Sequence, residues 1–405
     1  MFSLIVGTIA VEIILQIVAL AAPKHYALML GKAPPMMIKD QILGARGNPD
    51  FPDHDKDGFR NQSVPSQVVM VALGDSQTYG TGVKREEAWP KQMEALSKQP
   101  VYSMSCGGWG PTQSLLLFNE AIALHPKVII EAFYDGNDLY DSFASVYYDQ
   151  QLADLKTTDQ SEIKLIREAE ERNTLKNEVD SLFGKSDGPA VPEKSPKQIK
   201  SRVKEFLGKH IRIYQLLKAL MDHLRRTNTS QDWETRKRIA ESEKDKEFYQ
   251  IIDQGNLKTI LTPEYRLFAL NLSDPRIVEG HRIAMAALNR MKERSEAAHI
   301  QFIVMLIPTK ELVFRNAILR QSGALSKTDR ALVENEELVR QKMSTFLDGH
   351  GIHSIDIFPA LRAQVESGVQ PYPMSTDGHP NALGHRAIAE SALAELRRIN
   401  LLVRR

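Results

Sequence analysis

Short apolar runs alternate with amphipathic segments along most of the chain. Segments whose apolar positions recur with the period of a helix lie at residues 88–97, 113–124, 278–298, 332–347 and 382–399. The apolar runs are short enough for buried strands, and they lie at residues 68–73, 101–105, 128–134, 302–307 and 352–358. Because parallel strands need helical connections, this alternation predicts a parallel sheet with helices on both faces.

The segment between the third and fourth apolar runs breaks this alternation. Residues 145–271 are rich in Lys, Glu, Arg and Gln and contain no convincing core strand. Helical stretches lie at residues 162–182, 199–225 and 232–253, with a linker rich in Gly, Pro, Ser and Lys at 184–196. We interpret the segment as a helical insertion. Its mixed charge is typical of a solvated face, but its place after a strand end also fits a lid or a docking element near a site.

The N-terminus carries the longest apolar run. Residues 2–22 contain no Lys or Arg and are mostly Ile, Val, Leu and Ala. Since roughly 20 apolar residues span a bilayer as a helix, we expect a transmembrane anchor over residues 1–24. Glu12 and Gln16 interrupt the run four residues apart, hence on one helical face, where they either pair with another helix or are tolerated.

A cleaved signal peptide is the alternative for this run, because residues 19–21, Ala-Leu-Ala, form a small-x-small site. Lys24 is the one basic side chain near the run, too small a charge difference to fix its orientation. We expect an anchored protein whose main domain is periplasmic or extracellular.

Composition limits the remaining possibilities. The 405 residues are 42% hydrophobic and 25% charged, with a formal net charge of +1, which is typical of a globular chain and gives no basic excess for nucleic acid. The single cysteine, Cys106, excludes an internal disulfide and a multi-thiolate metal site. The expected organisation is an anchor at 1–24, a linker at 25–66, an α/β domain in two parts at 67–144 and 272–405, and the insertion at 145–271.

A serine follows the first predicted strand directly. Residues 74–80 read Gly-Asp-Ser-Gln-Thr-Tyr-Gly, which places Ser76 between a strand end and a helix start. Open α/β sheets bind ligands at this edge, and the backbone N–H groups of a helix start favour a developing oxyanion. The alternative is that Asp75 and Ser76 only cap the helix.

Two more polar loops follow the next two strands. Residues 107–113 read Gly-Gly-Trp-Gly-Pro-Thr-Gln, and residues 136–138 read Gly-Asn-Asp. A glycine lets the backbone N–H approach a ligand, and an asparagine side chain supplies another donor. Donors fixed where negative charge develops each lower a barrier by roughly 2.7–4 kcal/mol. Each loop alone could be a turn, but three such loops at one sheet edge predict a site.

A fourth loop precedes the last predicted helix. Residues 375–385 read Ser-Thr-Asp-Gly-His-Pro-Asn-Ala-Leu-Gly-His. A serine hydroxyl needs a base to accept its proton, and the base needs an orienting group. Asp377 and His379 can supply both from one loop. His385 is the competing base, but its position inside the helix favours a packing role.

Together these four strings resemble the four sequence blocks of the SGNH (GDSL-type) hydrolase superfamily. The match covers residues 59–143 and the C-terminal loop. The resemblance implies that Ser76 is the nucleophile, His379 the general base and Asp377 its orienting partner. It also implies an oxyanion hole made of the Ser76 and Gly108 N–H groups and the Asn137 side chain. The implied fold is a three-layer α/β/α sandwich, flavodoxin-like, with five parallel strands, and no metal or organic cofactor is implied.

Three positions depart from the usual pattern. Gln77 stands where the GDSL string has leucine. Ser103 stands where an asparagine often opens the second block, so Gly107 is an alternative to Gly108. One residue separates Asp377 from His379, where many SGNH esterases have two.

That shorter spacing resembles the polysaccharide O-acetyltransferases of the alginate type, as does the string Ile-Pro-Thr-Lys-Glu at residues 307–311. We therefore expect a serine esterase acting on O-acyl groups, O-acetyl in particular, of a carbohydrate or cell-envelope glycan. The alternatives are an O-acyltransferase that modifies a polysaccharide, with a membrane acyl-donor protein docked on the insertion, and a non-catalytic glycan-binding or assembly protein with the same fold.

Overall fold

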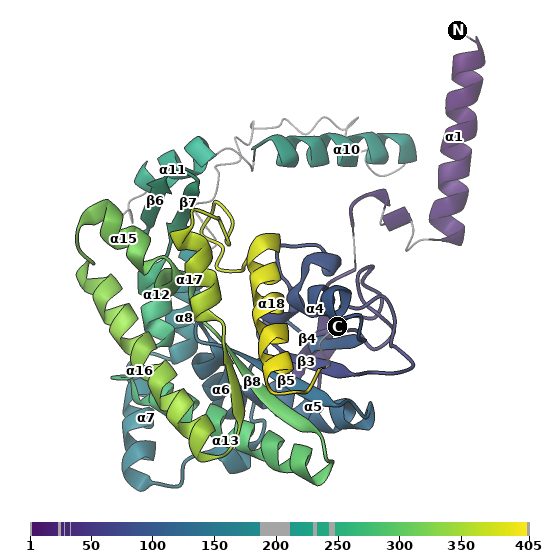
Figure 1. Cartoon of the computed structure of the whole chain (residues 1–405). Helices are drawn as coiled ribbons and strands as arrows, with labels where there is room; N and C mark the ends of the chain where they lie inside the picture. Colours follow the sequence, from purple (N-terminus) through teal and green to yellow (C-terminus); the bar gives the residue numbers. More distant parts are fainter. Residues whose placement is uncertain are drawn as a thin grey trace.

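A five-stranded parallel sheet forms the centre of the molecule (Figure 1). The computed structural model describes residues 2–22, 26, 27, 29–32, 34–186, 211–229, 233–242 and 248–402. The strands are β3 (Met70–Gly74), β4 (Val101–Ser105), β5 (Val128–Tyr134), β8 (Gln301–Ile307) and β9 (His353–Asp356), in the order β4-β3-β5-β8-β9. This order is that of a flavodoxin-like sheet, and all five predicted strands are confirmed.

Two hydrophobic cores lie on opposite faces of this sheet. Along β5, Ile129 and Phe133 belong to one core, whereas Ile130 and Ala132 belong to the other. Successive side chains of a strand point to opposite faces, so a strand buried on both sides is mostly apolar. The continuous apolar runs of the sequence have this cause.

Helices cover both faces, which makes three layers. The first core contains residues of α5 (Pro111–Ala123), α6 (Asp138–Tyr147), α13 (Pro275–Ala297) and α16 (Lys327–Gly349). The second contains residues of α4 (Trp89–Ser97), α14 (Lys310–Val313), α15 (Arg315–Ser322), α17 (Phe358–Glu366) and α18 (Ala382–Arg398). The predicted sandwich is thus confirmed, with helix bounds within a few residues of those expected except at α16, which extends five residues earlier.

One carboxyl group lies inside the first core. Glu131 of β5 is fully buried beside α5. Burial raises the pKa of Glu131 from its ordinary 4.5 to about 8, and the nearby Asp75 acts in the same direction. Since the unfolded chain releases this proton near pH 4.5 and the folded chain holds it to about pH 8, stability should fall as pH rises between these values.

We therefore expect Glu131→Gln to stabilise the protein at pH 8 by about 1–4 kcal/mol and to change it little at pH 5. The amide has the same shape but no proton to lose. Urea unfolding at both pH values measures the difference. A variant whose stability follows that of the wild type at both values would contradict the expectation.

The segment before β3 is more ordered than the linker predicted there. β1 (Met37–Asp40) and β2 (Gly44–Gly47) form an antiparallel hairpin. The turn at residues 53–58 packs against it so closely that a Cβ on Gly47 would lie 1.8 Å from the Gly58 carbonyl oxygen. The turn is closed by the Asp55 carboxylate, which accepts from the Asp57 and Phe59 N–H groups at 2.9 and 3.1 Å.

The first helix, α1 (Phe2–Ala21), projects from the α/β body and contacts α10 (Arg212–Thr229) (Figure 1). The Glu12 carboxylate accepts from the backbone N–H groups of Arg212 and Ile213 at 2.8 and 3.0 Å. The polar residues that interrupt the apolar run therefore pair with another helix.

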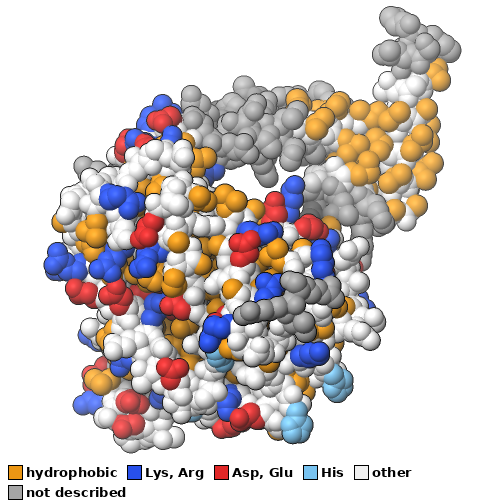
Figure 2. Space-filling view, in the orientation of Figure 1, with side chains coloured by type: hydrophobic (Ala, Val, Ile, Leu, Met, Phe, Trp, Pro, Cys, Tyr) orange, Lys and Arg blue, Asp and Glu red, His pale blue; other side chains and the backbone are white. Residues whose placement is uncertain are grey.

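Most of the other described side chains of α1 are apolar and exposed, as the orange side chains of Figure 2 show, whereas Leu15 is buried. In the described part of the chain, however, no helix has both the length and the apolarity needed to cross a bilayer. The transmembrane helix expected at residues 1–24 is thus not supported by the structure.

The insertion contains a hairpin besides its helices. Its helices are α7 (Gln160–Arg172), α8 (Leu175–Ser186), α10, α11 (Trp233–Ser242) and α12 (Pro263–Ala269). β6 (Gln250–Gln254) pairs antiparallel with β7 (Leu257–Leu261), so the expectation of a strandless segment was wrong here. The strands of this hairpin have the sequences Gln-Ile-Ile-Asp-Gln and Leu-Lys-Thr-Ile-Leu, which show no alternation of apolar and polar residues and are too short to stand out as strands. Residues 187–196 of the predicted linker, residues 199–210 of the second predicted helix, and residues 232 and 243–247 of the third lie outside the described residues.

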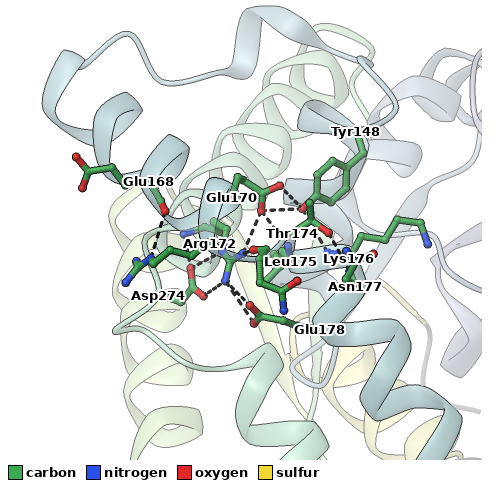
Figure 3. Close-up of polar contacts among 12 residues, drawn as sticks. Tyr148, Glu168, Glu170, Arg172, Thr174, Leu175, Lys176, Asn177, Glu178 and Asp274 are labelled. Carbon is green, nitrogen blue, oxygen red and sulfur yellow. Dashed lines mark hydrogen bonds and ion pairs between the residues drawn. The ribbon is translucent and has the colours of Figure 1, made fainter.

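A buried arginine fastens the insertion to α13. Arg276, only 4% exposed in its side chain, donates to Glu170 of α7 at 3.1 Å and lies 3.4 Å from Glu178 of α8. Glu170 also accepts from the Leu175 N–H at 2.9 Å. Figure 3 shows Glu170, Glu178 and Asp274 gathered at this joint. The start of α8 is therefore held rigidly against the sandwich.

Candidate active site

Ser76 is the first residue of the short helix α3 (Ser76–Tyr79), directly after β3. The turn needs a glycine before it: Gly74 has φ +140°, and a Cβ there would lie 2.5 Å from Thr78 Oγ1. Asp75 caps the helix by accepting from the Gln77 N–H at 2.8 Å. The capping role considered for the Asp-Ser pair thus belongs to Asp75, and the Ser76 hydroxyl is left for other contacts.

That hydroxyl meets the loop before α18. His379 Nε2 lies 2.8 Å from Ser76 Oγ, and His379 Nδ1 lies 2.6 Å from Asp377 Oδ1. The same Asp377 oxygen accepts from the His379 backbone N–H at 2.9 Å. A spacing of one residue is therefore sufficient for the carboxylate to reach its own loop's imidazole, and the three side chains form a continuous chain of contacts.

Asp377 is suited to orient an imidazole. Burial favours its neutral form, but the hydrogen bond to His379 and the charge of that ring outweigh burial, and the pKa of Asp377 is lowered. The group is therefore a carboxylate at neutral pH. It accepts a hydrogen bond from the Nδ1–H group, which leaves Nε2 unprotonated and able to take a proton from a hydroxyl.

The two other predicted loops reach the same place. Gly108 and Asn137 line a cavity together with Ser76 and His379. Gly108 has φ +74°, and within the described residues its N–H donates no hydrogen bond. Gly108 lines the cavity, whereas Gly107 is not among the lining residues. The geometry therefore favours Gly108 over Gly107 as the backbone donor to an oxyanion.

Asn137 is held by a residue that the sequence did not single out. Its Nδ2 donates to Asp141 Oδ2 at 2.6 Å, one turn along α6. Burial raises the pKa of Asp141 well above its ordinary value, so this partner is a neutral acid. The Asn137 side chain also hydrogen-bonds the buried Asp75 carboxyl, so two acids hold it at the edge of the cavity. The spacing of four residues was the signal that could have indicated the pair of Asn137 and Asp141.

The cavity has a volume of about 900 Å³, and the insertion supplies one of its walls. Phe183 of α8, Ile239 of α11 and Tyr265 of α12 all line it. Of the two interpretations of the insertion, the one that places it near the catalytic face fits the structure. Two charged residues of the insertion, Asp180 and Arg236, also line the cavity.

The loop that carries His379 is fastened to the insertion. Thr259 Oγ1 of β7 donates to the Pro373 carbonyl at 2.9 Å, and the Ile260 N–H donates to the Ser375 carbonyl at 3.3 Å. Lys310 also contributes to this junction between β7 and the His379 loop. It is fully buried, and its Nζ donates to the carbonyl oxygens of Ile260, Ser375 and Asp377 at 2.8–3.0 Å.

Lys310 lies in the string at residues 307–311, to which the sequence alone assigns no role in the site. We expect Lys310→Met to lower kcat by about 10- to 100-fold with a smaller change in KM, because three carbonyl groups of the His379 loop and β7 lose their charged donor. Steady-state kinetics with a soluble ester, alongside thermal unfolding, measures the split. The exposed Lys327→Met is the matched control. A folded Lys310→Met protein with unchanged kcat would contradict this role.

His385, the competing base, lies inside α18 with its side chain fully buried. Burial lowers the pKa of His385 to about 3, so the ring is neutral and belongs to the core. Among the described residues, no group of His, Cys, Asp and Glu side chains is arranged to hold a metal ion.

No protein-family model matches the sequence, and no curated protein matches it. Among solved structures, the chain is similar to an extracellular lipase from Streptomyces rimosus at 11% identity, with a TM-score of 0.38 over 81% of this chain and 99% of that one. It is similar to a GDSL-like lipase from Bacteroides thetaiotaomicron at 9% identity, with a TM-score of 0.32 over 84% and 93% of the two chains. For an acetyl xylan esterase from Butyrivibrio proteoclasticus the identity is 11% and the TM-score 0.31, over 84% and 66%.

At these identities and TM-scores the three structures bear on neither substrate nor activity, which rest on the geometry of the site. In its four loop sequences, in the order of its strands and in the contact between Ser76 and His379, the chain is similar to hydrolases of the SGNH (GDSL) type.

Proposed function

We propose that the protein is a serine esterase that acts on O-acyl groups, O-acetyl in particular, of a carbohydrate or cell-envelope glycan. The observation that carries the proposal is the chain of contacts from Ser76 Oγ through His379 to Asp377, at 2.8 and 2.6 Å. Such spacing between hydroxyl, imidazole and carboxylate is what nucleophilic catalysis by serine requires.

In this mechanism Ser76 Oγ attacks the acyl carbon while His379 Nε2 takes the hydroxyl proton. The carbonyl oxygen becomes negative and is held by the Ser76 and Gly108 N–H groups and the Asn137 side chain. The intermediate expels the sugar alcohol, which receives the proton from His379. Water or a second hydroxyl then attacks the acyl-enzyme by the same steps in reverse.

The size and lining of the cavity support a substrate larger than a simple ester. A volume of about 900 Å³ exceeds by far what an acetyl group needs. Tyr140, Tyr265 and Phe183 offer aromatic surface around the space above Ser76. Aromatic rings present a broad apolar face, which suits the flat side of a sugar ring.

An O-acyltransferase is the second candidate, favoured by the one-residue spacing of Asp377 and His379 and by the string at residues 307–311. An activated acetyl ester offered with and without oligosaccharide acceptors tests both, with the products followed by mass spectrometry. Free acetate alone indicates an esterase, and acetylated oligosaccharide indicates a transferase. If neither product forms, the site is not catalytic and the proposal is wrong.

We also propose that α1 attaches the protein to a membrane, with the α/β domain on the periplasmic or extracellular side. Its exposed apolar side chains support this: Val6, Ile9, Val11, Ile13, Ile14, Ile17 and Leu20. Cell fractionation of the full chain, beside a chain that begins at residue 23, tests the attachment. Equal amounts of both proteins in the soluble fraction would contradict it.

A further inference from the structure

A buried arginine lies between the two loops that carry the proposed chemistry. Arg266 of α12 lines the cavity, and its side chain is only 11% exposed. Its guanidinium lies against Gly378, the residue between Asp377 and His379: a Cβ on Gly378 would lie 2.5 Å from Nη2. On the other side, Nη1 lies 3.5 Å from the carbonyl oxygen of Gly136, directly before Asn137.

Two aromatic rings fix the orientation of this guanidinium. Its central carbon lies 4.7 Å from the centroid of the Tyr265 ring and 5.6 Å from that of Tyr134. Contacts of this kind stabilise the cation through the ring faces. They do not use its N–H bonds, which remain directed along the edges of the group.

Those N–H bonds are largely unfilled. In the described part of the chain, the 3.5 Å contact with Gly136 is the one hydrogen bond that the Arg266 guanidinium donates, and its buried Nε has none. A guanidinium has five N–H donors. A buried polar group without partners costs free energy, and a charged one costs more. Acceptors from a ligand in the cavity would remove this cost.

An ion pair with Glu311 does not account for the arrangement. Glu311 Oε2 lies 4.0 Å from Arg266 Nε, which balances charge but is too long for a hydrogen bond. The other oxygen of Glu311 is occupied by the Thr262 N–H at 2.9 Å. The Asp377 carboxylate is directed to His379. Neither neighbouring acid therefore fills the donors that face the cavity.

We infer that Arg266 binds a carboxylate of the substrate, so that the acylated sugar is a uronic acid or another carboxylated residue. The inference rests on the proposed function and narrows its substrate class. The planar guanidinium offers paired N–H bonds that match the two oxygens of a carboxylate. Its place between the Asn137 and His379 loops puts that carboxylate on the ring that bears the ester, or on the next one.

The test uses pairs of acetylated sugars that differ in one group: a hexuronic acid and the corresponding hexose, in the gluco, galacto and manno series. With the full-length protein, we expect kcat/KM for the acid to exceed that for the neutral sugar by about 10- to 100-fold in at least one pair, the range for a hydrogen bond to a charged group. In Arg266→Gln this ratio should fall to near one.

Two further variants guard against misfolding and unspecific loss. Arg266→Lys keeps a positive charge opposite Glu311 but lacks the paired donors, and we expect an intermediate ratio. Arg290→Gln removes a partly exposed arginine that pairs with Asp154, and we expect the wild-type ratio. Thermal unfolding of all variants identifies any that does not fold. If Arg266→Gln does not fold, the ratio of kcat/KM values is compared between the wild type and Arg266→Lys.

The inference is overturned if no pair of sugars shows a preference for the acid, or if Arg266→Gln retains that preference. It is also overturned if Arg266→Gln loses equal activity on the acid and on the neutral sugar. That result would mean that Arg266 stabilises the oxyanion or the fold. Hydrolysis of para-nitrophenyl acetate that depends on Ser76 tests the proposed function separately. Where that hydrolysis is present and the acid preference is not, only the inference about Arg266 fails.

Discussion

Ser76→Ala should lower kcat for ester hydrolysis by about 10⁴-fold or more, with little change in the free energy of unfolding. The hydroxyl is the group that would bond to the acyl carbon, so without it no acyl-enzyme can form. In the described contacts its partners are His379 Nε2 at 2.8 Å and Asp75 at 3.4 Å, so its loss leaves the fold intact. Release of para-nitrophenol from the acetate ester measures the effect.

Ser367→Ala is the matched control, because Ser367 lies on an exposed turn after α17 and its hydroxyl bonds only to the Gln364 carbonyl in the described contacts. Its rate should stay within about twofold of the wild type. Labelling with a fluorophosphonate adds a second criterion, since the adduct should map to Ser76. If Ser76→Ala kept most of its activity, or if the adduct lay elsewhere, the assignment of the nucleophile would be wrong.

His379→Ala should reduce kcat by a similar amount, about 10³- to 10⁴-fold or more. Without the imidazole, nothing accepts the Ser76 proton, and Asp377 loses the group that it orients. The combined variant Ser76→Ala with His379→Ala should be hardly slower than either single variant, because the two groups act in one step. Steady-state rates of the three proteins give this comparison.

His353→Ala is the control for His379→Ala. His353 lies on β9 and pairs with Glu395 at 2.6 Å, away from the residues that line the cavity. It should retain nearly full activity. Independent, multiplicative losses in the combined variant would show that Ser76 and His379 do not act together.

The fold could be predicted from the sequence because its signals are local. A strand buried on both faces is mostly apolar, and the runs at β3, β5 and β8 are of this kind, with Glu131 as the exception in β5. Parallel strands bring their carboxyl ends to one edge, which is why Ser76, Gly108 and Asn137 could be placed together before any coordinates. The Asp377–His379 loop needed the resemblance as well, since nothing local fixes where it folds back.

The rest depends on contacts between segments far apart in the chain. Arg266 and Lys310 are ordinary basic residues in the sequence, and only the folded chain brings them to Gly378 and to the Asp377 carbonyl. Asp141 was not identified because it lies within the amphipathic helix α6, where an acidic residue is ordinary in the sequence. The β6–β7 hairpin was missed because each of its strands has only five residues. So few apolar positions do not distinguish a strand from the polar, helix-rich sequence around it.

The junction between β7 and the His379 loop limits how this protein can be altered or combined with relatives. A graft that exchanges the whole insertion at residues 145–271 would remove the strand on which the proton-accepting loop rests, and would separate Lys310 from one of its carbonyl partners. An exchange confined to residues before β6 would alter the cavity wall while leaving that support in place. New substrate preferences are therefore best sought in α8 and α11, where the wall can change without disturbing the position of the base.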